Sequence, residues 1–309
     1  MLRICFFSIL FFVLHGIAEA QIPSVSSGKV IRHAAFPSSY ITARNIDIWL
    51  PDGYDTDNKK YPVLYMHDGQ MLFDSTNTWN HQEWKMDETA SELIRDGKVM
   101  PFIIVGIWNG GETRHADYFP QKPFEEMSQS DKDMIYKAVR QNGSDVFKGK
   151  TICSDNYLKF ITKELKSFID TNYRTKSDQK NTFIAGSSMG GLISMYAICE
   201  YPDIFGGAAC ISTHWPGIFQ MDNNPVPKAF FTYLRNHLPS PGNHKFYFDH
   251  GTATLDAMYP PLQTEANVIF KEKGYRKNHF TSLVFEGENH SEAAWSKRMQ
   301  YPLIFLLGK

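Results

Sequence analysis

The sequence predicts an α/β protein whose central, mostly parallel β-sheet is covered by helices on both faces. Continuous apolar runs of strand length alternate with segments of helical periodicity along most of the chain. Parallel strands need crossover helices between them, and because those helices cover both faces, the strands are apolar throughout. The 309 residues, 42 % of them hydrophobic, can bury one large core, and no linker or internal repeat divides them.

The first half of the chain supplies the opening strands. The runs 43–51 and 61–69 are rich in β-forming residues, and the dense polar turn between them predicts that they are neighbours in the sheet. A helix is expected over 84–98, followed by a strand over 101–109. Residues 110–153 then form a long polar insertion dotted with aromatic residues, a kind of segment that is usually functional or mobile.

The second half alternates regularly between helices and strands. Residues 154–173 carry one apolar stripe at helical spacing behind a Ser-Asp cap and predict a helix. The remaining elements are strands over 181–187, 205–213, 244–251 and 279–287, and helices over 189–202, 226–239, 259–274 and from about Ser291 to Leu307. This order is typical of one sheet covered on both faces.

The first twenty residues have the layout of a secretory signal peptide. Arg3 precedes an unbroken apolar run over 4–14, and small residues follow up to Ala20. The apolar run is shorter than a membrane-spanning helix requires, and an uncleaved anchor is the alternative. We therefore expect residues 21–309 to form a single domain that is secreted or periplasmic and has no membrane contact after cleavage.

Charge and cysteine usage exclude several classes of function. Lys and Arg number 32 against 33 Asp and Glu, without a dense basic tract, so nucleic acid is not an expected partner. Cys5 leaves with the signal peptide, and the spacing of Cys153, Cys199 and Cys210 does not suggest a metal site. Cys199 and Cys210 are close enough in sequence to pair, but their apolar surroundings favour buried thiols.

The stretch FIAGSSMGGL, residues 183–192, matches the pattern G-x-S-x-G with Ser188 at its centre. The pattern alone is a modest hint, but Ser188 also follows a predicted parallel strand and precedes a helix, where open α/β sheets bind their ligands. The glycines permit a sharp turn, and the N–H of Met189 at the helix start can stabilise an oxyanion. Ser188 is therefore the candidate nucleophile.

Such a nucleophile needs a histidine as base and an acid behind it. His290 lies in a loop after the last predicted strand, whereas His250 and His279 lie in strands or at their ends, where a packed histidine is ordinary. Asp256, in the loop before the penultimate predicted helix, is favoured as the acid over Asp249, which falls inside a strand. A Ser-His dyad without an acid is a further alternative.

The remaining candidates lie near the carboxyl ends of the predicted strands. Gly69 or Gln70, in the turn MHDGQMLFD, is expected to supply a second oxyanion N–H, and His67 is interpreted as a structural turn residue. Candidate substrate-binding residues are Trp108, Arg114, Tyr118, His214 and Trp215. For Trp108 and Trp215, core packing at the sheet rim is an equal alternative.

Three segments, YPVLYMHDGQMLFD, IAGSSMGGLISMYA and GENHSEAAW, resemble the putative-esterase family that includes esterase D, enterochelin esterases and the carbohydrate esterases that remove feruloyl or acetyl groups from xylan. The resemblance covers nearly all of the chain after the signal peptide. It implies an α/β-hydrolase fold, Ser188 as nucleophile, His290 as base, an acid that matches Asp256, and a serine esterase without cofactor or metal.

The resulting hypothesis is an exported serine carboxylic ester hydrolase that removes feruloyl or acetyl groups from polysaccharide or oligosaccharide fragments. Its partner would be a small-molecule or carbohydrate ester. Hydrolysis of a siderophore ester is the alternative reaction, and a non-catalytic binding protein on the same fold is the alternative of another class.

Overall fold

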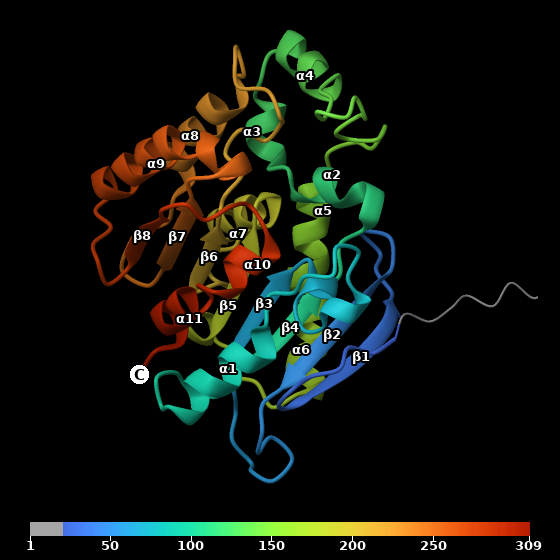
Figure 1. The fold of residues 1–309 in the computed structure, drawn as a ribbon. Helices are drawn as coiled ribbons and strands as arrows, with labels where there is room; N and C mark the ends of the chain where they lie inside the picture. The colour runs from blue at the N-terminus through green and yellow to red at the C-terminus, as the bar shows by residue number, and fades with distance from the viewer. Residues whose placement is uncertain (1–20) are drawn as a thin grey trace, which may run out of the picture.

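The structure, a computed structural model, describes residues 21–309, and the predicted signal peptide lies outside the described residues. Its centre is an eight-stranded sheet in the order β1-β2-β4-β3-β5-β6-β7-β8 (Figure 1). In this spatial order, the six strands β4, β3, β5, β6, β7 and β8 pair in parallel, whereas the β1–β2 and β2–β4 pairs are antiparallel. The predicted fold class is therefore confirmed. The strands are β1 (Lys29–Phe36), β2 (Arg44–Leu50), β3 (Val63–His67), β4 (Ile103–Ile107), β5 (Thr182–Ser187), β6 (Gly207–Ile211), β7 (Lys245–Gly251) and β8 (Phe280–Phe285).

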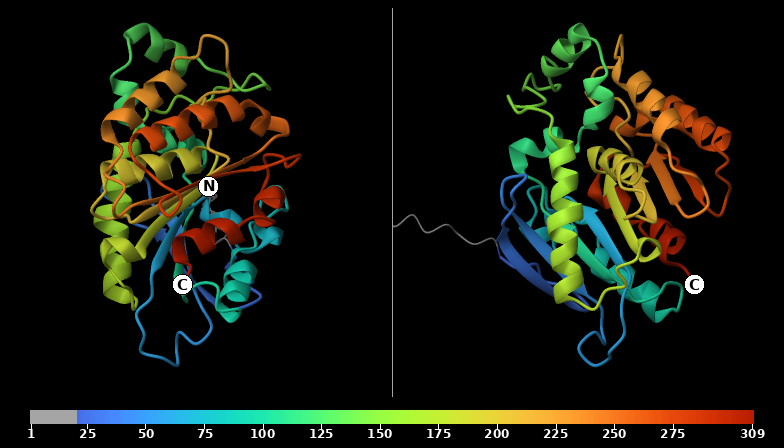
Figure 2. Two further views of the ribbon diagram at one scale, coloured as in Figure 1. Left: turned by 90° about the vertical axis from the view of Figure 1, so that its left-hand side faces the viewer. Right: turned by 180° about the vertical axis from the view of Figure 1, so that it is seen from behind.

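Helices cover both faces of the sheet (Figure 2). One face packs against α1 and α11, and the other against α5 to α9. The strand pleat explains the two cores, because Val63 and Tyr65 of β3 face one of them and Leu64 and Met66 face the other. The helices are α1 (Met86–Arg95), α2 (Arg114–Tyr118), α3 (Gln121–Glu125), α4 (Gln129–Tyr136), α5 (Ser154–Lys159), α6 (Lys166–Asn172), α7 (Met189–Glu200), α8 (Val226–His237), α9 (Pro260–Glu272), α10 (Glu292–Ser296) and α11 (Gln300–Leu307).

The prediction that the first two strands of the sequence analysis are neighbours is wrong. β4 lies between β2 and β3, antiparallel to β2 and parallel to β3. All five residues of β4 are buried, so this strand needs a partner on each side and a cover on each face. The polar turn between β2 and β3 therefore crosses over β4 instead of closing a hairpin.

Two predicted helices differ in detail. The helix over 154–173 is continuous, but its middle, Phe160–Leu165, is π-helical. The last helix is divided into α10 and α11, and Pro302 lies in the first turn of α11. A proline fits the first turn of a helix but not the middle of a continuous one, because it lacks the N–H that an interior position donates.

The insertion 110–153 is folded onto the body of the protein. It forms α2, α3 and α4, and the aromatic side chains of Phe119, Phe124 and Phe147 belong to the core on the α7 side of the sheet. The ring of Phe119 lies 5.3 Å from that of Phe230 of α8. In Figure 1 α3 lies beside α8, and α2 lies next to α5. The insertion therefore contributes a wall next to the sheet.

Two further expectations concern cysteines and membranes. Cys153, Cys199 and Cys210 are free thiols, so Cys199 and Cys210 do not form a disulfide. Within residues 21–309, no helix has both the length and the apolar character needed to cross a bilayer.

Candidate active site

Ser188 stands at a strained turn between β5 and α7. Its φ of 57° and ψ of −122° lie outside the regions that non-glycine residues ordinarily adopt. The turn is tight because Gly186 and Gly190 touch, and a Cβ on Gly186 would lie 2.8 Å from the backbone of Gly190. The Ser188 N–H donates to the carbonyl of Ile211 on β6, 2.9 Å away. This is the geometry by which a nucleophile elbow exposes its serine.

Ser188 and His290 line one cavity of about 450 Å³, together with Met189, Gln70, Arg114 and His214. A larger depression, of about 750 Å³, lies elsewhere and is lined by none of the candidate catalytic residues. Its walls include Asp178, Lys245 and Leu306. The candidate nucleophile and the candidate base therefore meet in one cavity.

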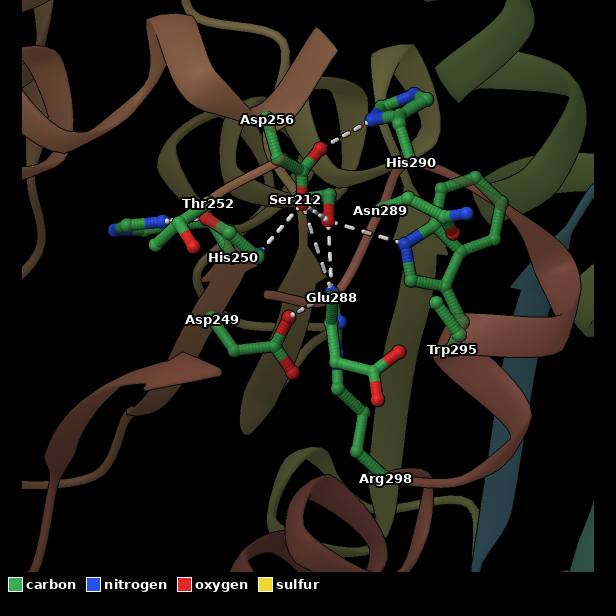
Figure 3. A network of polar contacts seen from close by, with 12 residues as sticks. Ser212, Asp249, His250, Thr252, Asp256, Glu288, Asn289, His290, Trp295 and Arg298 are labelled. Atoms are coloured by element: carbon green, nitrogen blue, oxygen red, sulfur yellow. Dashed lines mark hydrogen bonds and ion pairs between the residues drawn. The ribbon is translucent and has the colours of Figure 1, made fainter. Parts of the chain in front are cut away.

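Asp256 forms a hydrogen bond with His290, one of the residues that line this cavity (Figure 3). Its Oδ1 lies 2.5 Å from His290 Nδ1, and its Oδ2 accepts hydrogen bonds of 2.6 Å from the Ser212 hydroxyl and the Gly251 N–H. Burial by itself would raise the pKa of Asp256, but the hydrogen bonds and the charge of His290 outweigh it, and the pKa is lowered from its usual value. The carboxylate is therefore ionised and fixed in place.

Asp249 lies in β7 and has different partners. The Tyr247 hydroxyl donates to it over 2.9 Å, and the Arg298 guanidinium lies 3.0 Å from its other oxygen. Burial raises the pKa of Asp249 in spite of these two groups. Of the two carboxylates that the sequence offered, the geometry places Asp256, and not Asp249, against His290.

Ser212 joins the two carboxylates through a network that the sequence analysis missed. Its hydroxyl accepts from Trp295 Nε1 at 3.0 Å and from Arg298 at 2.8 Å, and donates to Asp256 (Figure 3). Ser212 also has a positive φ of 42°, directly after β6. Its position at the end of a strand next to the elbow was the available signal. Trp295 and Arg298 come from α10 and the turn that follows it.

The expected oxyanion donors lie at two helix starts. Met189 is the first residue of α7, where backbone N–H groups have no partner within the helix. Gln70 lines the cavity, whereas a Cβ on Gly69 would lie 2.4 Å from the backbone of Gly106. Gly69 thus permits close packing of the turn on β4, and Gln70 is the residue of the pair that lines the cavity.

The predicted substrate-binding residues divide into two groups. Arg114 and His214 line the cavity, but Trp108, Tyr118 and Trp215 are absent from its walls. Trp215 is fully buried and donates to Gln263. Tyr118 is fully buried beside His67. Trp108 donates its indole N–H to Asp47 over 2.7 Å.

Arg114 is held by an ion pair. Two of its nitrogens lie 2.6 and 2.7 Å from the two oxygens of Asp68, which also accepts from Asn109. Burial alone would raise the pKa of Asp68, but Arg114 and Asn109 outweigh it, so that the pKa lies below its usual value.

His214 is neutral in its setting. Burial, with the nearby His115 and His290, lowers its pKa well below the usual value, and its Nδ1 lies 2.8 Å from the Tyr259 hydroxyl. Burial likewise lowers the pKa of His115, a second cavity residue, to about 3. His115 lies within the insertion and belongs to no motif, so the sequence carries no signal that marks it as a cavity residue.

The cavity residues do not form a metal centre. Among residues 21–309, no group of three or more His, Cys, Asp or Glu side chains is placed to hold a metal ion. The chemistry that these groups can perform is proton transfer and nucleophilic attack, because a strained serine and a histidine line one cavity and an ionised carboxylate is hydrogen-bonded to that histidine.

Fold and family together define the class of protein: a serine esterase with the α/β-hydrolase fold. Residues 38–304 match the family model described as "Putative esterase", and the chain belongs to that family. The recognised resemblance is thereby confirmed.

Two curated relatives extend the comparison. The chain is 22 % identical over 273 residues to the uncharacterized protein YbbA of Bacillus subtilis, covering 86 % of this chain and 93 % of that one. It is 25 % identical over 289 residues to an endo-1,4-beta-xylanase/feruloyl esterase of Xylanibacter ruminicola, covering 89 % of this chain. The chain spans only 31 % of that longer relative.

Solved structures share the fold at low identity. A ferulic acid esterase superposes with a TM-score of 0.60 at 18 % identity, covering 90 % of this chain and 98 % of the other. An IroE-like serine hydrolase from Shewanella oneidensis gives 0.66 at 19 % identity, covering 90 % and 79 %. The enterobactin esterase FES from Shigella flexneri gives 0.64 at 15 % identity, covering 92 % and 61 %.

Proposed function

We propose that this esterase is exported and removes feruloyl or acetyl groups from polysaccharide or oligosaccharide fragments, with Ser188, His290 and Asp256 as its catalytic residues. The observation that carries the catalytic assignment is the bond between Asp256 and His290 beside the strained Ser188 in one cavity. The substrate class is supported by the name of the Xylanibacter ruminicola relative and by the resemblance of the three sequence segments.

The reaction begins with attack of the Ser188 hydroxyl on the ester carbonyl. His290 accepts the serine proton through Nε2, because its Nδ1 is engaged by Asp256. The proton then passes to the departing alcohol, which leaves an acyl group on Ser188. Water, deprotonated by the same histidine, releases the acid and restores the enzyme. The ionised Asp256 stabilises the imidazolium that forms in each half of the reaction.

The negative charge on the carbonyl oxygen needs donors that are already in place. The N–H of Met189 at the start of α7 is the first donor, and the backbone N–H of Gln70 is the second, since Gln70 lines the cavity and Gly69 packs against β4. Loss of one such donor typically costs about 10²- to 10³-fold in kcat.

Hydrolysis of a siderophore ester is the second candidate function. One observation favours it: the cation Arg140 also lines the cavity, and no carboxylate among residues 21–309 forms an ion pair with it. A neutral feruloyl or acetyl ester makes no use of such a group.

Hydrolysis of p-nitrophenyl acetate by the purified protein tests the mechanism. Ser188→Ala should abolish hydrolysis while the far-ultraviolet circular dichroism spectrum stays unchanged. Ser187→Ala, which changes the neighbouring serine, is the matched control and should keep most of the activity. Activity that survives in Ser188→Ala would refute the assignment.

A substrate panel tests the acyl group. Methyl ferulate, acetylated xylan and a ferric catecholate ester, compared at equal concentration, separate the two candidate reactions. Export is tested by mass spectrometry of the protein recovered from outside the cytoplasm. If the signal peptide is removed on export, the measured mass should be that of a chain that begins at Gln21.

A further inference from the structure

Arg140 is a cation at the wall of the candidate active site without an acidic partner. It lies within the insertion, in the segment that follows α4, is partly buried, and lines the same cavity as Ser188 and His290. Its guanidinium lies 4.9 Å from the ring centroid of Phe219. Among residues 21–309, no carboxylate forms an ion pair with it. A partly desolvated guanidinium that keeps its position by stacking is available to a ligand.

Two of the other charged residues that line this cavity form an ion pair with each other, since Arg114 donates hydrogen bonds to both oxygens of Asp68. Glu292 also lines the cavity and accepts a hydrogen bond of 2.8 Å from the neutral amide of Asn80, but it forms no ion pair with Arg140. Burial, and then the charge of the neighbouring cation Arg114, lower the pKa of Arg140. Among the residues that the structure describes, Arg140 therefore has no carboxylate as its counter-ion.

Arg140 also stands where the cavity continues beyond the candidate nucleophile. A second hollow of about 670 Å³ shares Arg140, Phe219 and Leu255 with the first, and extends to Met258. A substrate whose ester carbonyl is at Ser188 can therefore extend past Leu255 toward the guanidinium. Phe219 offers an apolar surface beside the charge at this junction.

We propose that Arg140 binds an anionic group of the substrate, so that the preferred esters carry a carboxylate or a comparable anion on the portion that extends from the scissile bond. This inference rests on the proposed function, because it takes Ser188 as the point of attack. Guanidinium binds carboxylates through paired, charge-assisted hydrogen bonds, which are about twice as strong as neutral ones. The partly buried setting strengthens this attraction and disfavours esters that leave the charge unmatched.

Matched ester pairs test the proposal on both sides of the scissile bond. On the acyl side, 4-nitrophenyl hemiglutarate is compared with 4-nitrophenyl valerate. On the alcohol side, 4-acetoxybenzoate is compared with its methyl ester. The wild type should show a higher kcat/KM for the anionic member of at least one pair, which also identifies the side that reaches Arg140.

Substitution of the arginine should remove that preference. Arg140→Gln should lower kcat/KM for the anionic member about 10- to 100-fold more than for its neutral partner, the range expected for a charge-assisted hydrogen bond. Arg140→Lys should restore part of the preference. Lys137→Gln, an equal change of charge at an exposed position before Arg140, is the matched control and should leave the ratio unchanged. Equal losses for both members in Arg140→Gln, or no preference in the wild type, would overturn the proposal.

Binding to an inactive variant separates this inference from the proposed mechanism. In a Ser188→Ala background, calorimetry should detect tighter binding of the anionic than of the neutral member in at least one of the two pairs, and the added Arg140→Gln change should remove the difference. Equal binding within both pairs would refute the anion site. Failure of the wild type to hydrolyse any of the four esters, with the binding difference intact, would refute the proposed reaction and leave the anion site standing.

Discussion

Asp256 lies 2.5 Å from Nδ1 of His290, although a second carboxylate, Asp249, is buried close by. Asp256 contacts His290 and Asp249 contacts Arg298, and their backbone positions explain the difference. Asp249 belongs to β7, and its side chain faces Tyr247 and Arg298, whereas Asp256 lies in the 3₁₀ turn Thr254–Met258 beyond the strand. The turn brings the carboxylate to the loop that carries His290. The Asp249 side chain leaves the sheet on the same face as Tyr247, where it meets Arg298 and not the loop of His290.

The first prediction separates the two carboxylates. Asp256→Asn should lower kcat for p-nitrophenyl acetate about 10³- to 10⁴-fold, because the amide neither stabilises the imidazolium nor holds the required tautomer of His290. Asp249→Asn should lower kcat less than about 10-fold, since the residue reaches His290 only through Arg298 and Ser212. Circular dichroism checks that both variants fold. A larger loss at Asp249 would reverse the assignment of the acid.

The second prediction concerns the hydroxyl that supports the acid. Ser212→Ala removes one of the three hydrogen bonds to Asp256, so the pKa of this carboxyl should rise from its lowered value toward the normal range. We expect kcat to fall about 10-fold, with a larger deficit at pH 5 than at pH 8, measured as a pH–rate profile. Trp295→Phe, which removes a donor to Ser212 but none to Asp256, should change the profile less. Parallel profiles for Ser212→Ala and the wild type would exclude a positioning role.

The strands and the elbow could be predicted because their signals are local. The apolar runs that became β2 to β8, and the glycines around Ser188, record burial and turn geometry within a few residues of sequence. His290 and Asp256 could be proposed because chain order and loop position restrict the choice. β1 was missed because its residues are only partly buried and do not form a continuous apolar run.

The remainder depends on contacts between distant segments. The position of β4 between β2 and β3 depends on the packing of the whole sheet. The polar turn between β2 and β3 does not reveal it. Ser212 follows β6 and Arg298 lies in the turn between α10 and α11. The two residues form a hydrogen bond although they are 86 positions apart in the sequence. The roles of Trp215 and Arg140 likewise depend on contacts with distant segments. An aromatic side chain near a strand end proved to be core, and an arginine in a polar insertion proved to line the cavity.

The third prediction concerns the ion pair in the cavity wall. Asp68→Asn leaves the Arg114 guanidinium with a neutral partner, and we expect a loss of about 2 to 4 kcal/mol in the free energy of unfolding at pH 7. The pKa of Asp68 is lowered in the folded protein, so its contribution is present above the usual value of 3.8 and is lost as the pH falls through the folded value. Urea unfolding at pH 7 and pH 3 should therefore show a smaller difference between variant and wild type at pH 3. The double change Asp68→Asn, Arg114→Met should recover part of the loss, and no recovery would contradict an electrostatic cause.

The fourth prediction concerns Glu88, in the first turn of α1. Burial, and then the hydrogen bond and charge of Asp87, raise the pKa of Glu88 to about 7. Because the folded protein holds a proton that the unfolded chain releases near pH 4.5, stability is complete below pH 4.5 and declines as the pH rises through about 7. Glu88→Gln should therefore be more stable than the wild type by about 1 to 2 kcal/mol at pH 8 and equal to it at pH 4.5. Glu92→Gln, on the exposed side of the same helix, is the control for urea unfolding across this range. An equal gain at both pH values would show that ionisation of Glu88 is not the cause.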